Sequence, residues 1–165
     1  MSGQLRPPRE QVSRRAVTYW AVRAGLGWLV VLAAVAVAVI ALPGHPAWLL
    51  WTGAAAVLAA AVHVTVMPRW RFHVHRWEVT SQAVYTQAGW FNVERRVAPV
   101  ARIQTVDSER GPLEQMFGIT KVTITTASAA GPLKIHGLDA DTAARLADQL
   151  TAEHDQAGLS GGDGT

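Results

Sequence analysis

The sequence predicts an α+β membrane protein, in which an N-terminal two-helix transmembrane hairpin is followed by an antiparallel β-barrel or sandwich that a C-terminal α-helix closes. Three observations predict this fold class. Half of the 165 residues are hydrophobic and only 16% are charged, with the apolar excess concentrated in residues 24–67. Beyond Pro68 the apolar residues alternate with polar ones, as in strands. One amphipathic helical pattern follows near the end of the chain.

The apolar region divides into two runs. Residues 24–42 are all apolar or Gly, and a helix of this length covers roughly 28 Å, close to the ~30 Å hydrocarbon core of a bilayer. A Pro-Gly-His-Pro turn at 43–46 leads into residues 47–67, which contain no Asp, Glu, Lys or Arg. Each run is too long for a usual strand, and a lone strand would leave its backbone unpaired in lipid. We therefore expect two membrane-crossing helices joined by a tight turn.

The flanking charges predict the orientation of this hairpin. Five arginines precede the first run, three follow the second, and the turn between the runs has no Lys or Arg. By the positive-inside rule, both termini are expected on the cytoplasmic side of the inner membrane. Arg and Trp residues at the ends of the two runs are the expected interface anchors: Arg14, Arg15, Trp20, Arg23, Trp48, Trp51, Arg69, Trp70 and Arg71.

The apolar region has two alternative interpretations. Residues 1–42 could be a cleaved signal peptide, but the apolar part of a signal peptide usually has about 7 to 15 residues, and the first run here is longer. His63 could relay protons, but a relay needs further ionisable partners in the membrane, and the two runs supply none. A hydrogen bond from His63 to a neighbouring carbonyl or to interfacial water is the expectation.

The net charge of +3 is distributed unevenly along the chain. The basic N-terminal arm, residues 1–23, has five arginines and one glutamate, whereas residues 68–155 have ten basic and ten acidic side chains. A basic segment beside an apolar run suits anionic lipid headgroups, so no nucleic-acid partner is expected. The chain has no cysteine, which excludes disulfides, thiolate catalysis and cysteine-ligated metals.

The segment after Pro68 is expected to form one small domain over residues 70–155. Alternation and turn residues predict strands near 71–79, 83–89, 91–98, 102–109, 119–126 and 132–137. Leu113, Met116 and Phe117 have the spacing of one helical turn. A longer helix is expected to start at an Asp139 N-cap and to end before Gly158, with residues 156–165 as a disordered tail.

Four motifs occur in this domain in a fixed order: Trp77-Glu78-Val79-Thr80, Gly89-Trp90-Phe91, Pro99-Val100-Ala101-Arg102-Ile103-Gln104-Thr105-Val106 and Pro112-Leu113-Glu114-Gln115-Met116-Phe117-Gly118. Over residues 70–150 the chain resembles the bacterial pleckstrin-homology-like (PH-like) domain of membrane-flanked, YdbS-like proteins. The resemblance implies a transmembrane hairpin before the domain, and seven strands. Only six strands can be placed, and a shift of apolar parity between Val74 and Trp77 indicates either a bulge or two merged strands.

Basic residues of the domain are candidate ligand contacts. PH domains that bind phosphoinositides gather Lys and Arg around the first hairpin, but the corresponding turn here, Thr80-Ser81-Gln82, has no cation. Phosphoinositide recognition is therefore not expected. Arg95 and Arg96 face opposite sides of one strand, and with Arg102 they either hold a lipid phosphate or acidic partner, or form a solvated surface.

Other polar groups give no case for catalysis or a cofactor. His73 and His75 point the same way if they lie on a strand, but a third metal ligand is not evident nearby. Asp107, Glu109 and Glu114 are acidic residues beside Arg110, as is common on a solvated surface. No phosphate loop, nucleophile elbow, zinc-protease helix or dinucleotide motif is found. No enzyme activity, metal or cofactor is expected.

These observations predict a non-catalytic protein-interaction or self-assembly module at the cytoplasmic face of the membrane, with a protein partner or a second copy as its ligand. The alternative is a domain that senses anionic lipid headgroups. A third possibility is an accessory subunit of a transporter or membrane enzyme.

Overall fold

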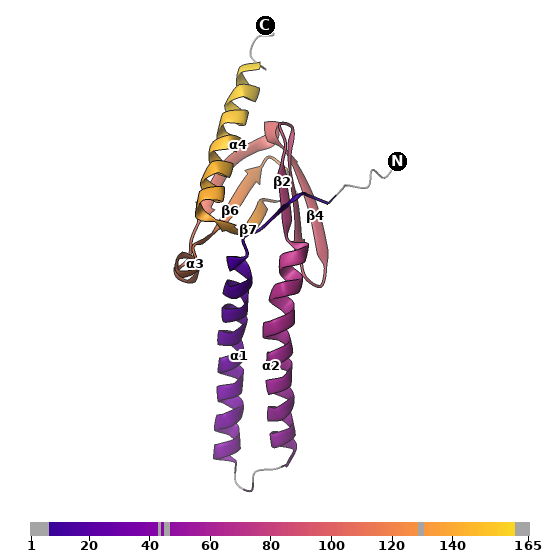
Figure 1. Cartoon of the computed structure of the whole chain (residues 1–165), viewed down its shortest axis with the longest axis vertical. Coiled ribbons are helices and arrows are strands. Elements are labelled where there is room, and N and C mark those ends of the chain that lie inside the picture. Colours follow the sequence, from indigo (N-terminus) through magenta and orange to yellow (C-terminus); the bar gives the residue numbers. More distant parts are fainter. Residues whose placement is uncertain (1–6, 43, 45–46, 129–130, 161–165) are drawn as a thin grey trace, which may run out of the picture.

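Two long antiparallel helices extend from one end of a β-rich domain in the computed structural model, which describes residues 7–42, 44, 47–128 and 131–160 (Figure 1). Helix α1 runs over Arg15–Ala41 and α2 over Ala47–Val74. Each is ~40 Å long at 1.5 Å per residue, longer than a bilayer core requires. The predicted helix bounds were too short, because α1 starts nine residues before Ala24 and α2 continues past Pro68.

The surplus turns of both helices belong to the folded domain. Pro68 interrupts the hydrogen bonding of α2, which costs ~3 kcal/mol in a helix interior. Packing of the following turn offsets this cost, since Phe72 contacts a buried cluster at the base of the domain. Residues 71–74 were predicted as the start of a strand and are helical instead.

The parts of the two helices away from the domain are apolar and exposed. Ile40, Val30 and Trp51 have 79%, 71% and 76% of their surface accessible, because two helices alone cannot cover one another's sides. Both helices are long and apolar enough to cross a membrane. The structure thus agrees with the expectation of two candidate spans.

In the described part of the chain, seven strands form two antiparallel sheets. The first sheet has the order β1-β2-β3-β4, from Glu10–Gln11, Arg76–Val79, Ala83–Gly89 and Val93–Pro99. The second has the order β5-β6-β7, from Ile103–Glu109, Ile119–Thr126 and Leu133–Asp139. A 3-10 turn, η1 (Val100–Arg102), joins the two sheets, and α3 (Pro112–Phe117) lies between β5 and β6. The sheets pack on each other without forming a closed barrel, so only the sandwich alternative is supported.

The seventh strand comes from an unexpected place. β1 precedes α1 and pairs with β2, with Glu10 opposite Trp77 and Gln11 opposite Arg76. The helical hairpin is therefore the connection between the first two strands of one sheet, which differs from the predicted order of an arm, a hairpin and then a separate domain. The alternation of apolar residues shifts before Trp77 because α2 ends and β2 begins there. Neither of the two predicted causes, a bulge or a pair of merged strands, is present at this point.

Two buried clusters hold the domain together. The larger lies between the sheets and α4 (Ala140–Ser160), and its largest fully buried members are Ile124, Leu138, Leu146, Leu150, Val84 and Val122. The smaller lies where α1 meets the sheets and contains Val12, Ala16, Tyr19, Trp20 and Ile119. Trp77 packs against both clusters, so the helices and the sheets share one core.

The two predicted helical segments of the domain are present. Gly118 ends α3 in the left-handed region, with φ of 63°. Asp139 caps α4, since the Thr142 N–H donates to its Oδ1 at 2.9 Å. The helix continues to Ser160, so Gly158 and residues 156–160, predicted as part of a tail, are helical. Residues 161–165 of that predicted tail lie outside the described residues.

Candidate functional site

The junction between the helices and the sheets is built around Trp20. Its side chain is only 3% exposed, the guanidinium carbon of Arg71 lies 4.5 Å from its ring centroid, and the ring of His75 lies 5.1 Å away. The sequence predicted Trp20 and Arg71 as anchors at the membrane surface. In the structure Trp20 is buried and Arg71 is half-buried, because both helices continue into the domain, and an Arg over an indole face gains a cation–π contact there.

His75 is held neutral at this junction. Its Nδ1 lies 2.9 Å from the Arg71 carbonyl and so carries the donated hydrogen, while its Nε2 accepts from Arg71 Nε at 3.4 Å. Burial, together with the neighbouring Arg71 charge, lowers the pKa of His75 to about 4. The same two causes lower the pKa of His136 on β7 to about 4. Both imidazoles are therefore neutral near pH 7.

Helix α1 docks directly on the backbone of β7. The Ser13 N–H donates to the Gly137 carbonyl at 2.8 Å, and Gly137 has φ of 84°. A Cβ at this position would lie 2.7 Å from Ala16 Cβ and 3.6 Å from Trp20 Cζ2. Only glycine allows this approach, so Gly137 fixes where the helical hairpin meets the sheets.

A polar chain links α1 to α3. Arg23 Nη1 donates to the Tyr19 hydroxyl at 3.3 Å, and that hydroxyl donates to Glu114 Oε1 at 3.4 Å. The second Glu114 oxygen accepts from the Gly111 N–H at 2.7 Å, which caps α3. Glu114 is thus a structural carboxylate, and the general acid/base role that its sequence position could suggest has no support.

A second polar chain fixes the β3–β4 hairpin to α2. Gln87 on β3 donates from Nε2 to the Val74 carbonyl at 3.0 Å, one of the carbonyls that a helix end leaves without an internal partner. Arg95 on β4 donates from Nε to Gln87 Oε1 at 2.9 Å. Arg95, predicted as a lipid or partner contact, therefore positions the hairpin against the helix.

The turn of this hairpin forms one wall of a large groove. The groove has a volume of about 890 Å³ and is lined by Trp28 of α1, a face of α2 that includes Leu58, Val62, His63, Val66 and Trp70, and the turn residues Trp90 and Phe91. Trp28 Nε1 donates to His63 Nδ1 at 2.9 Å, so the predicted partner of His63, a carbonyl or water, is replaced by an indole from the other helix. The sequence interpretation gave Trp90 and Phe91 no role, although two aromatic residues in a turn were a visible signal.

The remaining predicted arginines lie on the other side of the domain. Arg96 donates from Nη1 to the Pro132 carbonyl at 2.7 Å and from Nη2 to the Gly131 carbonyl at 3.2 Å, so its side chain spans the opening between β4 and β7. Arg96 and Arg102 line the same small cavity of about 150 Å³, and Arg96 with Lys134 and His136 lines another of about 330 Å³. Arg95 contributes to neither, so the three arginines do not converge.

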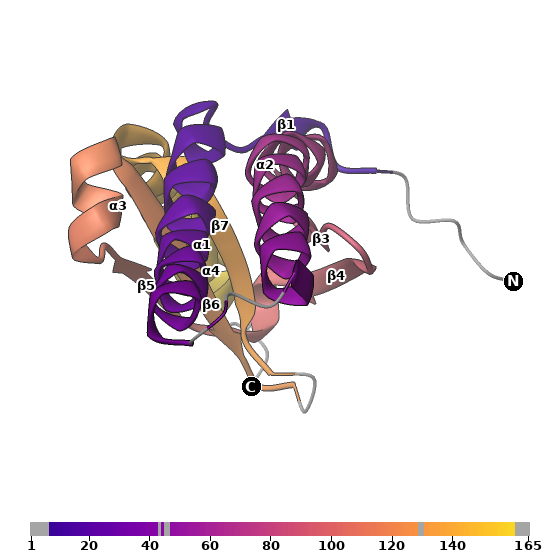
Figure 2. The ribbon, with the colours of Figure 1, turned by 90° about the horizontal axis from the view of Figure 1, so that it is seen from below.

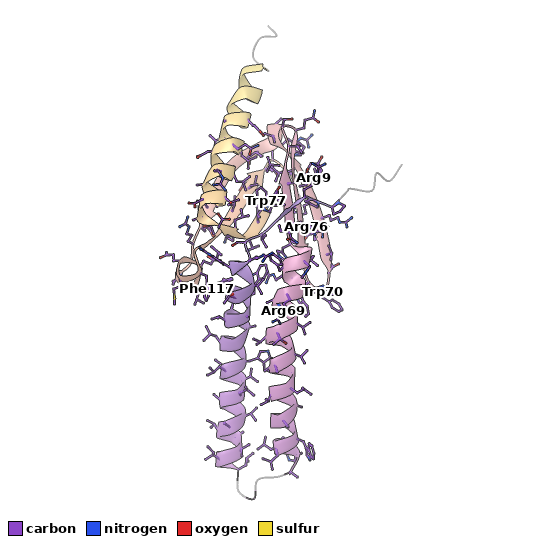
Figure 3. The ribbon with its side chains drawn as sticks, viewed as in Figure 1. Arg9, Arg69, Trp70, Arg76, Trp77 and Phe117 are labelled. Atoms are coloured by element: carbon purple, nitrogen blue, oxygen red, sulfur yellow. The ribbon has the colours of Figure 1, made fainter. Side chains whose placement is uncertain are left out.

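The predicted membrane-surface anchors other than Trp20 and Arg71 are all exposed. Trp48 and Trp51, near the start of α2, are 61% and 76% exposed, and Trp70 is 58% exposed. Arg69 and Trp70 lie next to each other in the part of α2 nearest the domain, at about the height of Phe117 in α3 (Figure 3). The exposed anchors also include Arg14, Arg15 and Arg23 on or beside the first turns of α1.

The groups considered for a metal or for catalysis are dispersed. His73 lies in α2, where its Nδ1 is 2.7 Å from the Arg69 carbonyl, so the predicted strand pair of His73 and His75 does not exist. Glu109 forms an ion pair with Lys121, which lowers the pKa of that exposed carboxyl, and Asp107 accepts from the Thr105 hydroxyl. Within the described residues, no three or more His, Asp or Glu side chains gather where they could hold a metal.

Comparison with known proteins now identifies the fold. A family model described as the bacterial PH domain matches residues 21–154. The chain belongs to the bacterial PH domain family. It is also 31% identical over 147 residues to a curated Bacillus subtilis (strain 168) protein named UPF0699 transmembrane protein YdbS, a match that covers 87% of this chain and 91% of the relative. No solved structure matches the chain.

These matches confirm the resemblance inferred from the motifs. The bacterial PH match begins within α1 and includes most of the helical hairpin, which agrees with a hairpin and sheets that share one core. With two exposed apolar helices and a transmembrane relative, this is a membrane-associated PH-like protein.

Proposed function

We propose that this bacterial PH domain protein is a non-catalytic interaction module, held at the cytoplasmic face of the inner membrane by two membrane crossings, whose domain binds a protein partner or a second copy. The observation that carries the proposal is the open edge strand β4. It is the last strand of the first sheet, and within the described chain no other strand pairs with its outer edge.

The side chains of β4 fit this role. Val93 and Val97 are 45% and 39% exposed on the outer face of the sheet, whereas Arg96 faces the opening between the sheets and Ala98 is buried. An edge strand of seven residues is a template for an added strand, because no other strand of the described chain forms a ladder on its outer side. All copies in one membrane have the same orientation, with β4 running away from the bilayer. Two β4 strands from neighbouring copies would therefore pair in parallel.

The cytoplasmic orientation rests on charge. Arg14, Arg15 and Arg23 lie at the domain end of α1 and Arg69 at the domain end of α2, whereas the far turn has no Lys or Arg. The positive-inside rule therefore favours the domain on the cytoplasmic side. A reporter fused to Thr165 that is active only in the cytoplasm tests this orientation, and activity of a periplasmic reporter instead would refute it.

The alternative function, sensing of anionic headgroups by arginines, has less support. Arg95 and Arg96 already donate to Gln87 and to two backbone carbonyls. Arg102 lies in η1, directly after β4. The seven residues of β4 span roughly 20 Å, so Arg102 lies about that far from the turn beside α2. Arg102 is therefore poorly placed for the headgroups of the anchoring membrane, and Arg95 and Arg96 are engaged within the protein.

A crosslinking experiment tests the interaction module. Because the chain has no cysteine, a Val97→Cys variant carries one thiol on the outer face of β4. Treatment of native membranes with a maleimide–benzophenone photocrosslinker, which needs a thiol on this chain alone, should give one defined adduct, of twice the chain mass for a second copy. Ser81→Cys, exposed in the β2–β3 turn, is the control and should give none.

The specificity of the adduct decides the outcome. Adding Val93→Lys should abolish the adduct, because a charge on an edge strand opposes pairing. Equal adducts at positions 97 and 81, an adduct that survives Val93→Lys, or no adduct at either position would each refute the role of β4.

A further inference from the structure

The β3–β4 turn exposes aromatic side chains in an unusual way. Trp90 is 51% exposed and Phe91 is 91% exposed, the highest value among the large hydrophobic side chains of the described residues. Turn tips in water are usually occupied by Gly, Pro, Asn, Asp and Ser. An aromatic pair is instead the usual content of a membrane interface, where rings lie among lipid headgroups.

The depth of this turn follows from its contact with α2. The ring centroid of Trp90 lies 6.1 Å from that of His63. His63 precedes Arg69, the first charged residue at this end of α2, by six positions, or ~9 Å along the helix axis. With Arg69 at the level of the lipid headgroups, Trp90 lies closer to the centre of the bilayer, at the level of the acyl chains.

The turn is held at this depth by rigid contacts. The Gln87 bond to the Val74 carbonyl and the Arg95 bond to Gln87 fix the hairpin to the end of α2. At the tip, Gly89 pairs with Val93 and has φ of 124°, and a Cβ there would lie 1.8 Å from the Asn92 carbonyl oxygen. The hairpin therefore presents its aromatic residues in a preformed arrangement.

The turn and α2 form the walls of the lateral groove described above. Figure 2 shows β3 and β4 beside α2, on the flank opposite α3. The groove lies on this flank, between the turn, α2 and Trp28 of α1. Its walls are almost entirely apolar, with Leu58, Val62 and Val66 on one side and Phe91 on the other. On the opposite flank, α3 exposes Met116, which is 78% accessible.

We infer that the β3–β4 turn is a third membrane element, which inserts Trp90 and Phe91 into the leaflet on the domain side, and that a lipid acyl chain occupies the groove between the turn and α2. The inference rests on the proposed two-span anchor. A lipid chain fits the apolar walls at this depth, and the turn's aromatic rings gain apolar contact that they lack in water. The insertion holds the domain in one orientation on the bilayer.

Site-directed spin labelling of the full chain tests this inference, because the absence of cysteine permits single labels. Labels are placed at Asn92→Cys, which keeps both aromatic residues, at Leu58→Cys on the lipid-facing side of α2, and at Ser81→Cys in the β2–β3 turn. The purified protein is reconstituted in phosphatidylethanolamine–phosphatidylglycerol vesicles. Access of oxygen, which partitions into lipid, is compared with access of a water-soluble nickel chelate.

The label at position 92 should resemble the label at 58, with an oxygen-to-nickel accessibility ratio several-fold above that at 81. Phe91→Asp should return position 92 to the ratio found at 81, provided that circular dichroism shows an unchanged fold. A ratio at 92 equal to that at 81 in the parent chain overturns the inference. A label at 92 that is shielded from both reagents, and becomes accessible when the protein is diluted in lipid, assigns the groove to a second copy and also overturns it.

The control at position 58 separates the two proposals. If position 58 is accessible to oxygen while position 92 is not, the two-span anchor stands and only the third element fails. If position 58 is accessible to the nickel chelate, the anchor itself is refuted.

Discussion

Gly137 and Ala16 are in contact at the point where the helical hairpin joins the sheets, since a Cβ added to Gly137 would lie 2.7 Å from Ala16 Cβ. This contact places the start of α1 against β7 of the second sheet, while β1, just before α1, pairs with β2 of the first sheet. The backbone of β7 must come close to α1 for Val12, Ala16 and Trp20 to be buried.

Gly137→Ala should strongly destabilise the protein. Left-handed backbone costs a residue with a Cβ ~1–2 kcal/mol, and overpacking adds ~1–3 kcal/mol. The matched control is Gly131→Ala, which has φ of 78° but no atom within 4 Å of the added Cβ. Thermal unfolding in detergent should show a clearly larger loss for position 137, and equal losses would contradict the proposed close approach.

Stability should fall as the pH falls from about 6.5 toward about 4. His75 and His136 have a pKa of about 4 in the folded chain against 6.5 for an unperturbed histidine. In this range the unfolded chain binds protons that the folded chain does not, so each histidine lowers the free energy of unfolding by ~1.4 kcal/mol per pH unit. Above pH 6.5 both states are deprotonated, and these groups give no slope.

Melting temperatures measured across this range check the prediction. His136→Gln should reduce the slope between pH 4 and 6.5 and leave it unchanged between pH 7 and 8. A parent protein with the same stability at pH 5 and pH 7 would show that these imidazoles are not held neutral.

Arg96→Gln should loosen the opening between β4 and β7. The substitution removes two hydrogen bonds from a charged donor to the Pro132 and Gly131 carbonyls, contributions of ~1.5–3 kcal/mol each before compensation by water. Arg102→Gln changes an exposed arginine nearby and should alter stability by ~0.5 kcal/mol or less. Amide hydrogen exchange should rise in β4 and β7 for the first variant only, and unchanged exchange there would show that Arg96 does not join the sheets.

Trp28→Phe should weaken packing between α1 and α2. The change keeps an aromatic ring but removes the hydrogen bond to His63, and hydrogen bonds between membrane helices contribute ~0.6–1.7 kcal/mol. Thr65→Val is the control, because the Thr65 hydroxyl donates to the Ala61 carbonyl of its own helix at 2.7 Å. Unfolding in increasing fractions of dodecyl sulfate measures the difference. A Trp28→Phe variant as resistant as Thr65→Val would indicate that the interhelical bond adds no stability.

Local sequence patterns predict much of the secondary structure. The two apolar runs, the alternation in β3 and β6, the Gly118 end of α3 and the Asp139 cap of α4 depend on residues close together in sequence. The ends of the helices are harder to predict from sequence. Helix α2 continues beyond Pro68 because its last turns contact the domain.

The sequence by itself determined two apolar helices long enough to cross a membrane and a following segment of strands, because hydrophobic length and period are properties of neighbouring residues. Its motifs carried the resemblance to the PH-like domain. Only the tertiary structure decided that Glu10–Gln11 complete the sheet, that Trp20 is buried against His75 and Arg71, and that Trp90 contacts α2. Glu10 and Gln11 are both polar and exposed, so the sequence around them has no periodicity that marks a strand. Contacts across many residues depend on how complete elements pack, which no short window of sequence contains.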